Sequence, residues 1–420
     1  MVSDDKLQGF LTWCRNNGIF FEGLEIRACE KSGNGVFATK FFQVNEKLIE
    51  VPKNLMITAG KIADMQKYSE LLNKSKFIPT PFELLTLFFC LEDTESSLYA
   101  PYLDMLPKSF STPSYLNKYV DIDHLPSSVR KYWCIQQKDL QEIWEKIHRI
   151  VPQISHSKFL WAWHVVNTRC IYVENKTHEK VDNSDGGKEN VICVVYDDTL
   201  AVIPFVDMLN HDPCAKCLAM FESYSDKYVV RATHCVLEDQ ELTVCYGSHD
   251  NCRLWMEYGF TLPDNPNGKV VVEQSQFIEL AKSVGLPVSS QHEQALYSAA
   301  LPWQAYCLIC HYFVISLYLS DEKPSWALWA NMKILMLPTS DLKHWRDIIY
   351  GEHSQFSSNT NDHTSEAVVQ KMAEYRMLEK IITELKRVFA EMLTAVPEDI
   401  KWIWEEQLLI VNIILSSFMH

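Results

Sequence analysis

The 420-residue sequence predicts an α+β protein, in which a β-rich domain containing a helical insertion precedes an all-α C-terminal domain. Short alternating segments separated by turns occupy residues 203–246, which is typical of strands. From Pro81 the apolar residues change to helical spacing, and beyond about Asn267 only helical spacing remains. The predicted domains are an N-terminal helix in residues 1–24, the β-rich domain in residues 25–262 with its insertion at about 70–190, and the helical domain in residues 268–420.

The first predicted element is a helix that Ser3 or Asp4 caps and Gly18 ends. Its apolar residues recur at helical spacing: Leu7, Phe10, Leu11 and Cys14. A short strand over Ile26–Ala28 leads to Gly33-Asn34-Gly35. Taken alone, this triplet predicts a tight hairpin turn, because glycine tolerates positive φ. The same two glycines would also let a ligand approach the backbone closely.

A turn and a strand are predicted over residues 45–52, with Pro52 at the strand end as sheet rules allow. The insertion contributes helices starting at Pro81 and spanning residues 140–151 and 158–172. Residues 177–190 are polar and contain glycine, so they predict a loop. A hairpin of residues 218–222 and 228–233 then precedes a strand over residues 241–246.

The C-terminal part predicts helices over residues 277–284, 302–319, 325–336, 366–393 and 399–417. Residues 352–364 are polar and predict a linker. The uncharged segment 295–320 has the length of a membrane span. It contains Pro302, Gln304 and His311, so a buried helix is the preferred interpretation.

Composition restricts the function classes. The formal net charge of −15 argues against direct nucleic-acid binding, which neutralises phosphates with Lys and Arg, and favours encounter with basic partners. No signal-peptide pattern follows Met1. Thirteen cysteines without a framework spacing are interpreted as reduced, mostly buried thiols. We therefore expect a protein of the cytoplasm and nucleus that does not bind membranes.

Two CxxC pairs, Cys214–Cys217 and Cys307–Cys310, leave a metal site as an alternative. A structural zinc ion needs four ligands, and His211 or His234 could complete the first pair. Neither pair has a second CxxC nearby, so we predict no metal.

The stretch Ile203–Phe260 carries the most informative motifs. Asn210-His211 follows an apolar strand directly, although buried polar groups need hydrogen-bond partners. Tyr246-Gly247 ends a later strand, and a short helix runs from Asn251 to Phe260. This order resembles the two signature motifs of SET-domain methyltransferases. Together with the helical insertion and the helical C-terminal domain, it resembles the Rubisco large-subunit methyltransferase-like branch.

The resemblance implies a knotted SET domain and S-adenosyl-L-methionine (AdoMet) as cofactor. It also implies a monomeric protein-lysine N-methyltransferase that acts on basic segments, with histone tails among the candidates. A histidine acceptor remains open, because the family contains a histidine methyltransferase. A catalytically silent SET module that binds a partner is a second alternative. A small-molecule methyltransferase is disfavoured, because such enzymes usually have a doubly wound fold with a Gly-rich first turn.

The resemblance also assigns residues. Tyr246 is the catalytic candidate, because a phenol can orient the acceptor amine and accept CH contacts from the methyl group. The resemblance assigns cofactor binding to Gly33, Asn34, Gly35, Glu46, Leu48, Arg169, Asp207, Asn210, His211 and Tyr246. Substrate binding falls to Thr168, Tyr258 and Phe260. Taken alone, Arg169 could equally be a paired or snorkelling side chain. Asp212 departs from the family, in which Ser is commoner at this position.

Overall fold

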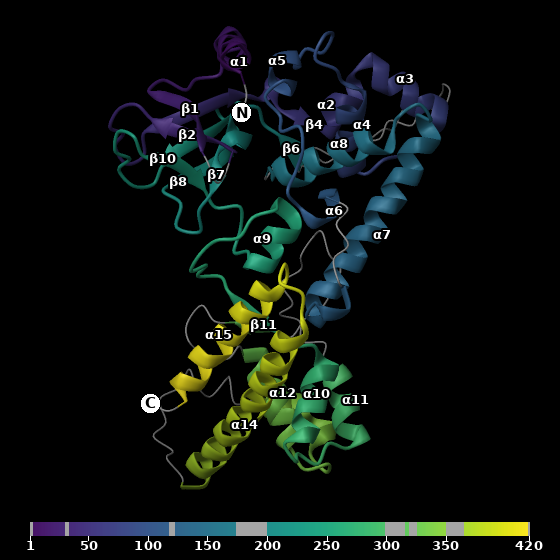
Figure 1. Cartoon of the computed structure of the whole chain (residues 1–420), viewed down its shortest axis with the longest axis vertical. Coiled ribbons are helices and arrows are strands. Elements are labelled where there is room, and N and C mark those ends of the chain that lie inside the picture. Colours follow the sequence, from purple (N-terminus) through teal and green to yellow (C-terminus); the bar gives the residue numbers. More distant parts are fainter. Residues whose placement is uncertain are drawn as a thin grey trace. The chain divides into compact units, whose positions relative to one another are not determined.

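The computed structural model describes residues 3–29, 33–116, 122–173, 200–298, 316–318, 326–349 and 365–418. The chain forms two compact units, and Figure 1 labels the helices and strands within them. The first comprises Met1–Lys118, Gln137–Ser248 and Leu254–Phe260; the second comprises Tyr119–Gln136, His249–Arg253 and Thr261–His420. Each unit has its own hydrophobic core. These two units do not test the predicted domain boundaries at residue 24 and at residues 262–268, which stay predictions.

The helices before residue 261 are α1 (Asp4–Asn16), α2 (Ala59–Asp64), α3 (Gln66–Ser75), α4 (Pro81–Leu91), α5 (Ala100–Leu103), α6 (Pro113–Leu116), α7 (Ser127–Ile150), α8 (His156–Arg169) and α9 (Asn251–Tyr258). The strands are β1 (Leu24–Cys29), β2 (Gly33–Ala38), β3 (Lys47–Pro52), β4 (Ile57–Thr58), β5 (Cys170–Tyr172), β6 (Leu200–Val202), β7 (Asn210–His211), β8 (Cys217–Glu222), β9 (Lys227–Ala232) and β10 (Glu241–Val244). Short 3-10 turns lie at Lys53–Leu55, Ile122–His124 and Val206–Met208.

Local sequence signals explain several helix starts. Thr80 and Glu83 form a reciprocal capping box before α4, and Pro81 occupies its first turn. Ser155 caps α8 by accepting a hydrogen bond from the backbone N–H of Lys158. Ser3 occupies the N-cap position of α1 as predicted, but its side chain makes no capping bond.

Among its described residues, the first unit contains three small sheets, with strand orders β1-β2-β10-β7, β3-β9-β8 and β4-β6-β5. Strand β10 lies between β2, to which it is antiparallel, and β7, to which it is parallel. In the parallel pair, Thr243 lies opposite Asn210 and Val244 opposite His211. The two polar motifs, about thirty-five residues apart in sequence, therefore end beside each other.

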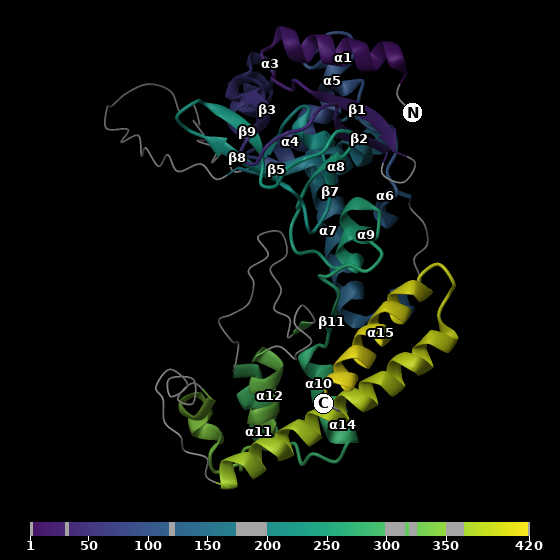
Figure 2. The ribbon, with the colours of Figure 1, turned by 90° about the vertical axis from the view of Figure 1, so that its left-hand side faces the viewer.

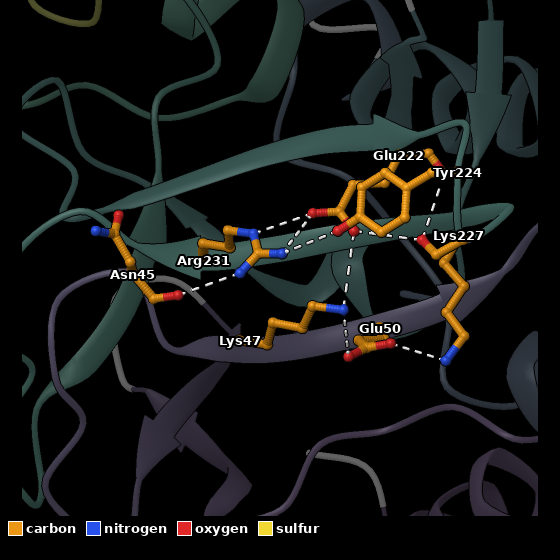
Figure 3. A network of polar contacts seen from close by, with 8 residues as sticks. Asn45, Lys47, Glu50, Glu222, Tyr224, Lys227 and Arg231 are labelled. Atoms are coloured by element: carbon orange, nitrogen blue, oxygen red, sulfur yellow. Dashed lines mark hydrogen bonds and ion pairs between the residues drawn. The ribbon is translucent and has the colours of Figure 1, made fainter.

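Strands β3, β9 and β8 are joined by a network of ion pairs (Figure 3). Glu222 accepts hydrogen bonds from Arg231 Nη2 at 2.6 Å and Nε at 3.0 Å. Glu50 receives Lys47 Nζ at 2.9 Å and Lys227 Nζ at 2.8 Å. The network spans all three strands, where a register shift in β3 between Lys47 and Ile49 interrupts the regular ladder.

The second unit is mainly helical. Its elements are β11 (Lys269–Val271), α10 (Gln274–Ser283), α11 (Ser290–Ser298), β12 (Ser316–Tyr318), α12 (Trp326–Met336), a 3-10 turn at Leu342–His344, α14 (Ser365–Ala395) and α15 (Lys401–Ser417). Helices α14 and α15 pack side by side (Figures 1 and 2). Leu378, Ile382, Leu385 and Phe389 form the buried face of α14 at the predicted three-to-four spacing.

The structure corrects several predicted boundaries. The helix predicted over 158–172 ends at Arg169, because Cys170–Tyr172 pairs with β6 as strand β5. The helix predicted from residue 140 begins at Ser127. Gly33-Asn34-Gly35 does not form the turn itself but the start of β2, with Gly33 opposite Cys29. The C-terminal part is helical as predicted except for the β11–β12 ribbon, which includes the end of the segment 302–319 predicted as helical.

Some predictions fall outside the described residues: the loop at 177–190, most of segment 302–319, the linker at 352–364 and the Cys307–Cys310 pair. Among the described helices, each is too short or too polar to cross a membrane. Within the same described ranges, no group of three or more His, Cys, Asp and Glu side chains is arranged to hold a metal ion.

Candidate active site

The parallel β7–β10 pair places Tyr246 directly beside the Asn210-His211 motif. The backbone N–H of Tyr246 donates to His211 Nδ1 at 3.1 Å, and the Tyr246 hydroxyl donates to the Leu209 carbonyl at 2.7 Å. The two rings stack with centroids 5.1 Å apart. Because Nδ1 of His211 accepts a hydrogen bond, the proton of the neutral ring lies on Nε2. Burial lowers the pKa of His211, which favours this neutral form.

Tyr246 itself remains protonated over the physiological range. Burial raises the pKa of its phenol to about 12, although the positive charge of Arg169 acts in the opposite direction. The hydroxyl proton is already donated to Leu209, so the phenolic oxygen faces any further partner as an acceptor. This oxygen can therefore orient an amine without acting as a base.

Asn210 connects β7 to the Gly33-Asn34-Gly35 segment. Its amide donates to the Asn34 carbonyl at 3.2 Å and to Glu241 Oε1 at 2.7 Å. A Cβ atom at Gly35 would lie 2.5 Å from the same Glu241 oxygen. Glycine at this position is thus required by the close approach of the Glu241 carboxylate. The structure brings Asn34, Gly35 and Asn210 together as one polar cluster.

Arg169, at the end of α8, is held by the backbone and the side chain of Asp207. Its Nη1 donates to the Asp207 carbonyl at 3.0 Å and to Oδ2 at 2.9 Å. Tyr102 of α5 donates its hydroxyl to the same Oδ2 at 2.7 Å. Burial raises the pKa of the Asp207 carboxyl, while Arg169 and Tyr102 act in the opposite direction. The arrangement keeps a guanidinium at a half-buried position next to the β7 motif.

The backbone before Asp207 is strained. Phe205 adopts a φ of +75°, which bulky residues rarely take, and its side chain is fully buried. Its ring lies 4.6 Å from that of Phe21 and 6.2 Å from that of Phe10. Aromatic packing therefore holds the turn that aims Asp207 at Arg169.

Tyr258 and Phe260, at the end of α9, complete an aromatic cluster. The Tyr258 ring lies 5.1 Å from that of Tyr246 and 6.2 Å from that of Phe260. The Phe260 ring lies 6.3 Å from that of His211. Four aromatic rings from β7, the segment after β10 and the end of α9 thus meet, and the substrate-binding role assigned to Tyr258 and Phe260 stays a prediction.

Three buried polar atoms of this site lack a hydrogen-bond partner among the described residues: Arg169 Nε, Asp207 Oδ1 and His211 Nε2. Buried polar atoms normally have partners, so their concentration here indicates a polar ligand. Two are donors and one is an acceptor, which fits a ligand carrying both a carboxylate and an amine or amide-like nitrogen. The methionine end and the adenine of AdoMet carry these groups, so the residues fit this cofactor.

For three predicted site residues, the observed contacts do not show the assigned role. The Leu48 side chain is fully buried in the core, at the register shift of β3 between Lys47 and Ile49. Glu46 accepts a hydrogen bond from the nearby backbone of Gln43. Thr168 donates its hydroxyl to the His164 carbonyl of its own helix. The structure shows no contact of these three side chains with the Tyr246 cluster, and their assigned roles stay predictions.

Sequence reasoning missed Glu241 and Tyr102. Glu241 starts β10 and interacts with both Gly35 and Asn210, so an acidic residue opposite a Gly-rich strand was the available signal. Tyr102 is fully buried, and a buried tyrosine usually has a partner for its hydroxyl. Its partner Asp207 lies 105 residues away, so the pairing itself could not be read locally.

The chain is similar to several known proteins. The sequence profile described as SET domain matches residues 33–247. SET domain-containing protein 4 of Homo sapiens is 27% identical over 404 residues, covering 91% of this chain and 84% of the human protein. The ribosomal lysine N-methyltransferase set11 of Schizosaccharomyces pombe is 26% identical over 291 residues, covering 67% of this chain and 68% of the yeast protein.

Two further similarities have lower sequence identity. The actin-histidine N-methyltransferase of Gallus gallus is 22% identical over 369 residues, covering 84% of this chain and 56% of the chicken protein. The solved structure of the SET domain of LSMT bound to lysine and AdoHcy aligns with a TM-score of 0.61 at 14% identity, covering 99% of this chain and 91% of the solved chain. This last similarity shows the fold.

Because the matched profile covers more than half of its length, the chain belongs to the SET domain family. It is an AdoMet-dependent protein methyltransferase, and its α+β fold is the one predicted from its sequence.

Proposed function

We propose that the protein transfers methyl groups from AdoMet to a lysine side chain in a basic segment of another protein, with histone tails and other proteins as candidates. The observation that carries the proposal is the packing of Tyr246 against His211 and Tyr258, with Phe260 next to both His211 and Tyr258. Support also comes from the lysine methyltransferase set11, which is similar over two thirds of this chain.

The cofactor would be held by the polar atoms described above. Arg169 is suited to the cofactor carboxylate, because a guanidinium forms strong charge-assisted hydrogen bonds with carboxylates. Asn210 donates both N–H groups of its amide, to the Asn34 carbonyl and to Glu241 Oε1, so it would hold the Gly33-Asn34-Gly35 segment beside the methionine end. His211 Nε2–H offers a further donor. When bound, AdoMet supplies a methyl group activated by its sulfonium.

Tyr246 would align the acceptor. Its oxygen accepts an N–H of the lysine amine or weak CH contacts of the methyl group, because its own proton is committed to Leu209. The high pKa excludes the phenolate as a base near neutral pH, so the ammonium loses its proton to water before transfer. Tyr258 and Phe260 enclose the side-chain stem and stabilise the incoming cation through their ring faces.

The first test is titration calorimetry with AdoMet. The parent protein should bind AdoMet, and Asn210→Ala should bind it at least tenfold more weakly, because two donors at the Glu241 cluster are lost. Asn73→Ala, on the exposed face of α3, is the matched control and should bind as the parent does. A folded parent that does not bind AdoMet would reject the proposed function.

The acceptor is tested with recombinant core histones and with peptide pairs in which one lysine is replaced by histidine. We expect label on lysine, and Tyr246→Phe should lower the rate by roughly a hundredfold while AdoMet binding persists. Label on histidine alone would favour the histidine alternative, for which the similarity to actin-histidine N-methyltransferase provides a specific reason. AdoMet binding without transfer to either acceptor would favour the silent module.

We infer that the protein acts as a monomer in the cytoplasm and the nucleus. Free thiols such as Cys14, Cys90 and Cys217 support a reducing compartment. Imaging of the tagged full-length chain and sedimentation at micromolar concentration test the two parts of this proposal separately.

A further inference from the structure

The side-chain amide of Asn167 in helix α8 contacts the end of α9. Asn167 Nδ2 donates to the Glu257 carbonyl at 3.2 Å and to Glu257 Oε2 at 2.7 Å. Glu257 is only 6% exposed, and it directly precedes Tyr258. A hydrogen bond from a half-buried amide to a buried carboxylate is worth more than an ordinary surface contact. The position of the last turn of α9 therefore depends on Asn167.

The same turn has a second side-chain contact. Ser111 Oγ donates to the Gly259 carbonyl at 2.9 Å. Gly259 has a φ of +82°, and a Cβ atom there would lie 2.7 Å from the backbone carbon of Ser111 and the backbone nitrogen of Thr112. The segment at residues 111–112 is thus in direct backbone contact with the turn, between the two aromatic residues of the proposed acceptor channel.

Asn167 also lies two residues before Arg169 on the same helix. Arg169 contacts Asp207 at the proposed cofactor site, whereas Asn167 contacts the turn that carries Tyr258 and Phe260. One helix end therefore fixes a cofactor residue and the acceptor channel at a constant separation, which in-line transfer between the two requires.

We propose that Asn167 is a positioning residue for the acceptor: by holding the Glu257–Gly259 turn, it sets the distance of Tyr258 and Phe260 from Tyr246 and so controls how tightly a lysine side chain is bound. This inference rests on the proposed function for the identity of the acceptor. It does not concern AdoMet binding, which depends on other residues.

Asn167→Asp tests the proposal. The new carboxylate faces two acceptor oxygens of Glu257 and has no donor for either. We expect the KM for core histones to rise about tenfold, with the Kd for AdoMet changed less than twofold. Adding Glu257→Gln to Asn167→Asp restores one donor–acceptor pair in the reverse direction, and this double variant should recover much of the lost affinity. A merely structural role would change the Kd for AdoMet together with the KM, whereas a positioning role changes the KM alone.

A second readout does not need activity. In protein labelled with 3-fluorotyrosine, the ¹⁹F resonance of Tyr258 is assigned by its loss in Tyr258→Phe. It should shift or broaden in Asn167→Asp and return in the double variant. If both the Tyr258 resonance and the acceptor KM stay as in the parent, the proposal is overturned. Should Asn167→Asp fail to fold, Ser111→Ala removes the hydrogen bond to the Gly259 carbonyl and is expected to give a smaller change of the same kind.

The two proposals fail differently. A parent that binds no AdoMet rejects the proposed function and, with it, the role of Asn167 toward the acceptor. A parent that binds AdoMet and methylates histones, with Asn167→Asp equally active, rejects the role of Asn167 alone.

Discussion

Tyr246 combines a donated proton with an environment that resists ionisation. The unperturbed phenol titrates near pH 10, whereas burial raises the pKa of Tyr246 to about 12. The neutral hydroxyl can therefore persist at the alkaline pH at which the acceptor amine loses its proton. The hydrogen bond to Leu209 and the raised pKa both favour a neutral Tyr246 that orients the acceptor amine.

This gives a prediction for the pH dependence of methyl transfer. The rate should rise from pH 7 to about pH 10 as the lysine amine deprotonates, with no falling limb in this range, because the Tyr246 phenol ionises only near pH 12. Steady-state kcat/KM across this range is the measurement. A falling limb near pH 9 in the parent that is absent from Tyr246→Phe would contradict it.

At the level of the elements, the β3-β9-β8 sheet depends on the network of Figure 3. Glu222 is 7% exposed at its side chain and receives both Arg231 and Lys47. Burial alone would raise the pKa of Glu222, but hydrogen bonds with Tyr224 and Arg231 and the nearby Lys47 lower it overall. A carboxyl whose pKa is lower in the folded state stabilises the protein above its unfolded pKa and loses that contribution as the pH falls.

Glu222→Gln should therefore lower the free energy of unfolding by about 1 kcal/mol at pH 7 and by less at pH 3, because a carboxyl with a lowered pKa loses its stabilising contribution as the pH falls. Urea unfolding at the two pH values measures the difference. Glu384→Gln is the matched control, because its ion pair with Arg387 lies on the surface of α14 and should contribute little. An equal loss at both pH values would show that the charge of Glu222 is not what stabilises the sheet.

Much of this architecture follows from local sequence. Thr80 and Glu83 indicate the start of α4, and the alternation of apolar and polar residues on both sides of Asp226 indicates the β8–β9 hairpin. Both signals act within a few residues. The end of α8 was misplaced by three residues, since Cys170–Tyr172 forms β5 only by pairing with β6, thirty residues later. Tertiary pairing overrides helical periodicity in such cases.

The candidate site likewise combines residues that were predicted from the sequence with residues that were not. Asn210, His211 and Tyr246 were predicted from motifs that resemble a known family. The structure stacks His211 on Tyr246, while the Asn210 side chain contacts Asn34 and Glu241. Glu241 and Tyr102 contribute contacts that depend on long-range packing, so neither could be found from spacing alone. The roles of Glu46 and Leu48 were assigned from the resemblance only and stay predictions.

For the whole molecule, the net charge of −15 bears on how a basic substrate is reached. Long-range attraction accelerates encounter at low ionic strength and is screened when the Debye length shortens to a few ångströms. Raising the salt concentration from about 50 mM to about 500 mM should therefore lower kcat/KM for a Lys-rich peptide severalfold. Stopped-flow binding of that peptide should show the change in the association rate. An unaltered association rate would indicate that the global charge does not guide the substrate.

The contacts of α8 also restrict how this sequence can change in length. Inserting one residue between His164 and Asn167 would rotate all later side chains of the helix by about 100°. Asn167 and Arg169 would then point away from Glu257 and Asp207 together, so a single insertion would disable two distant contacts at once. Functional variants of this protein should tolerate substitutions along α8 far better than insertions or deletions within it.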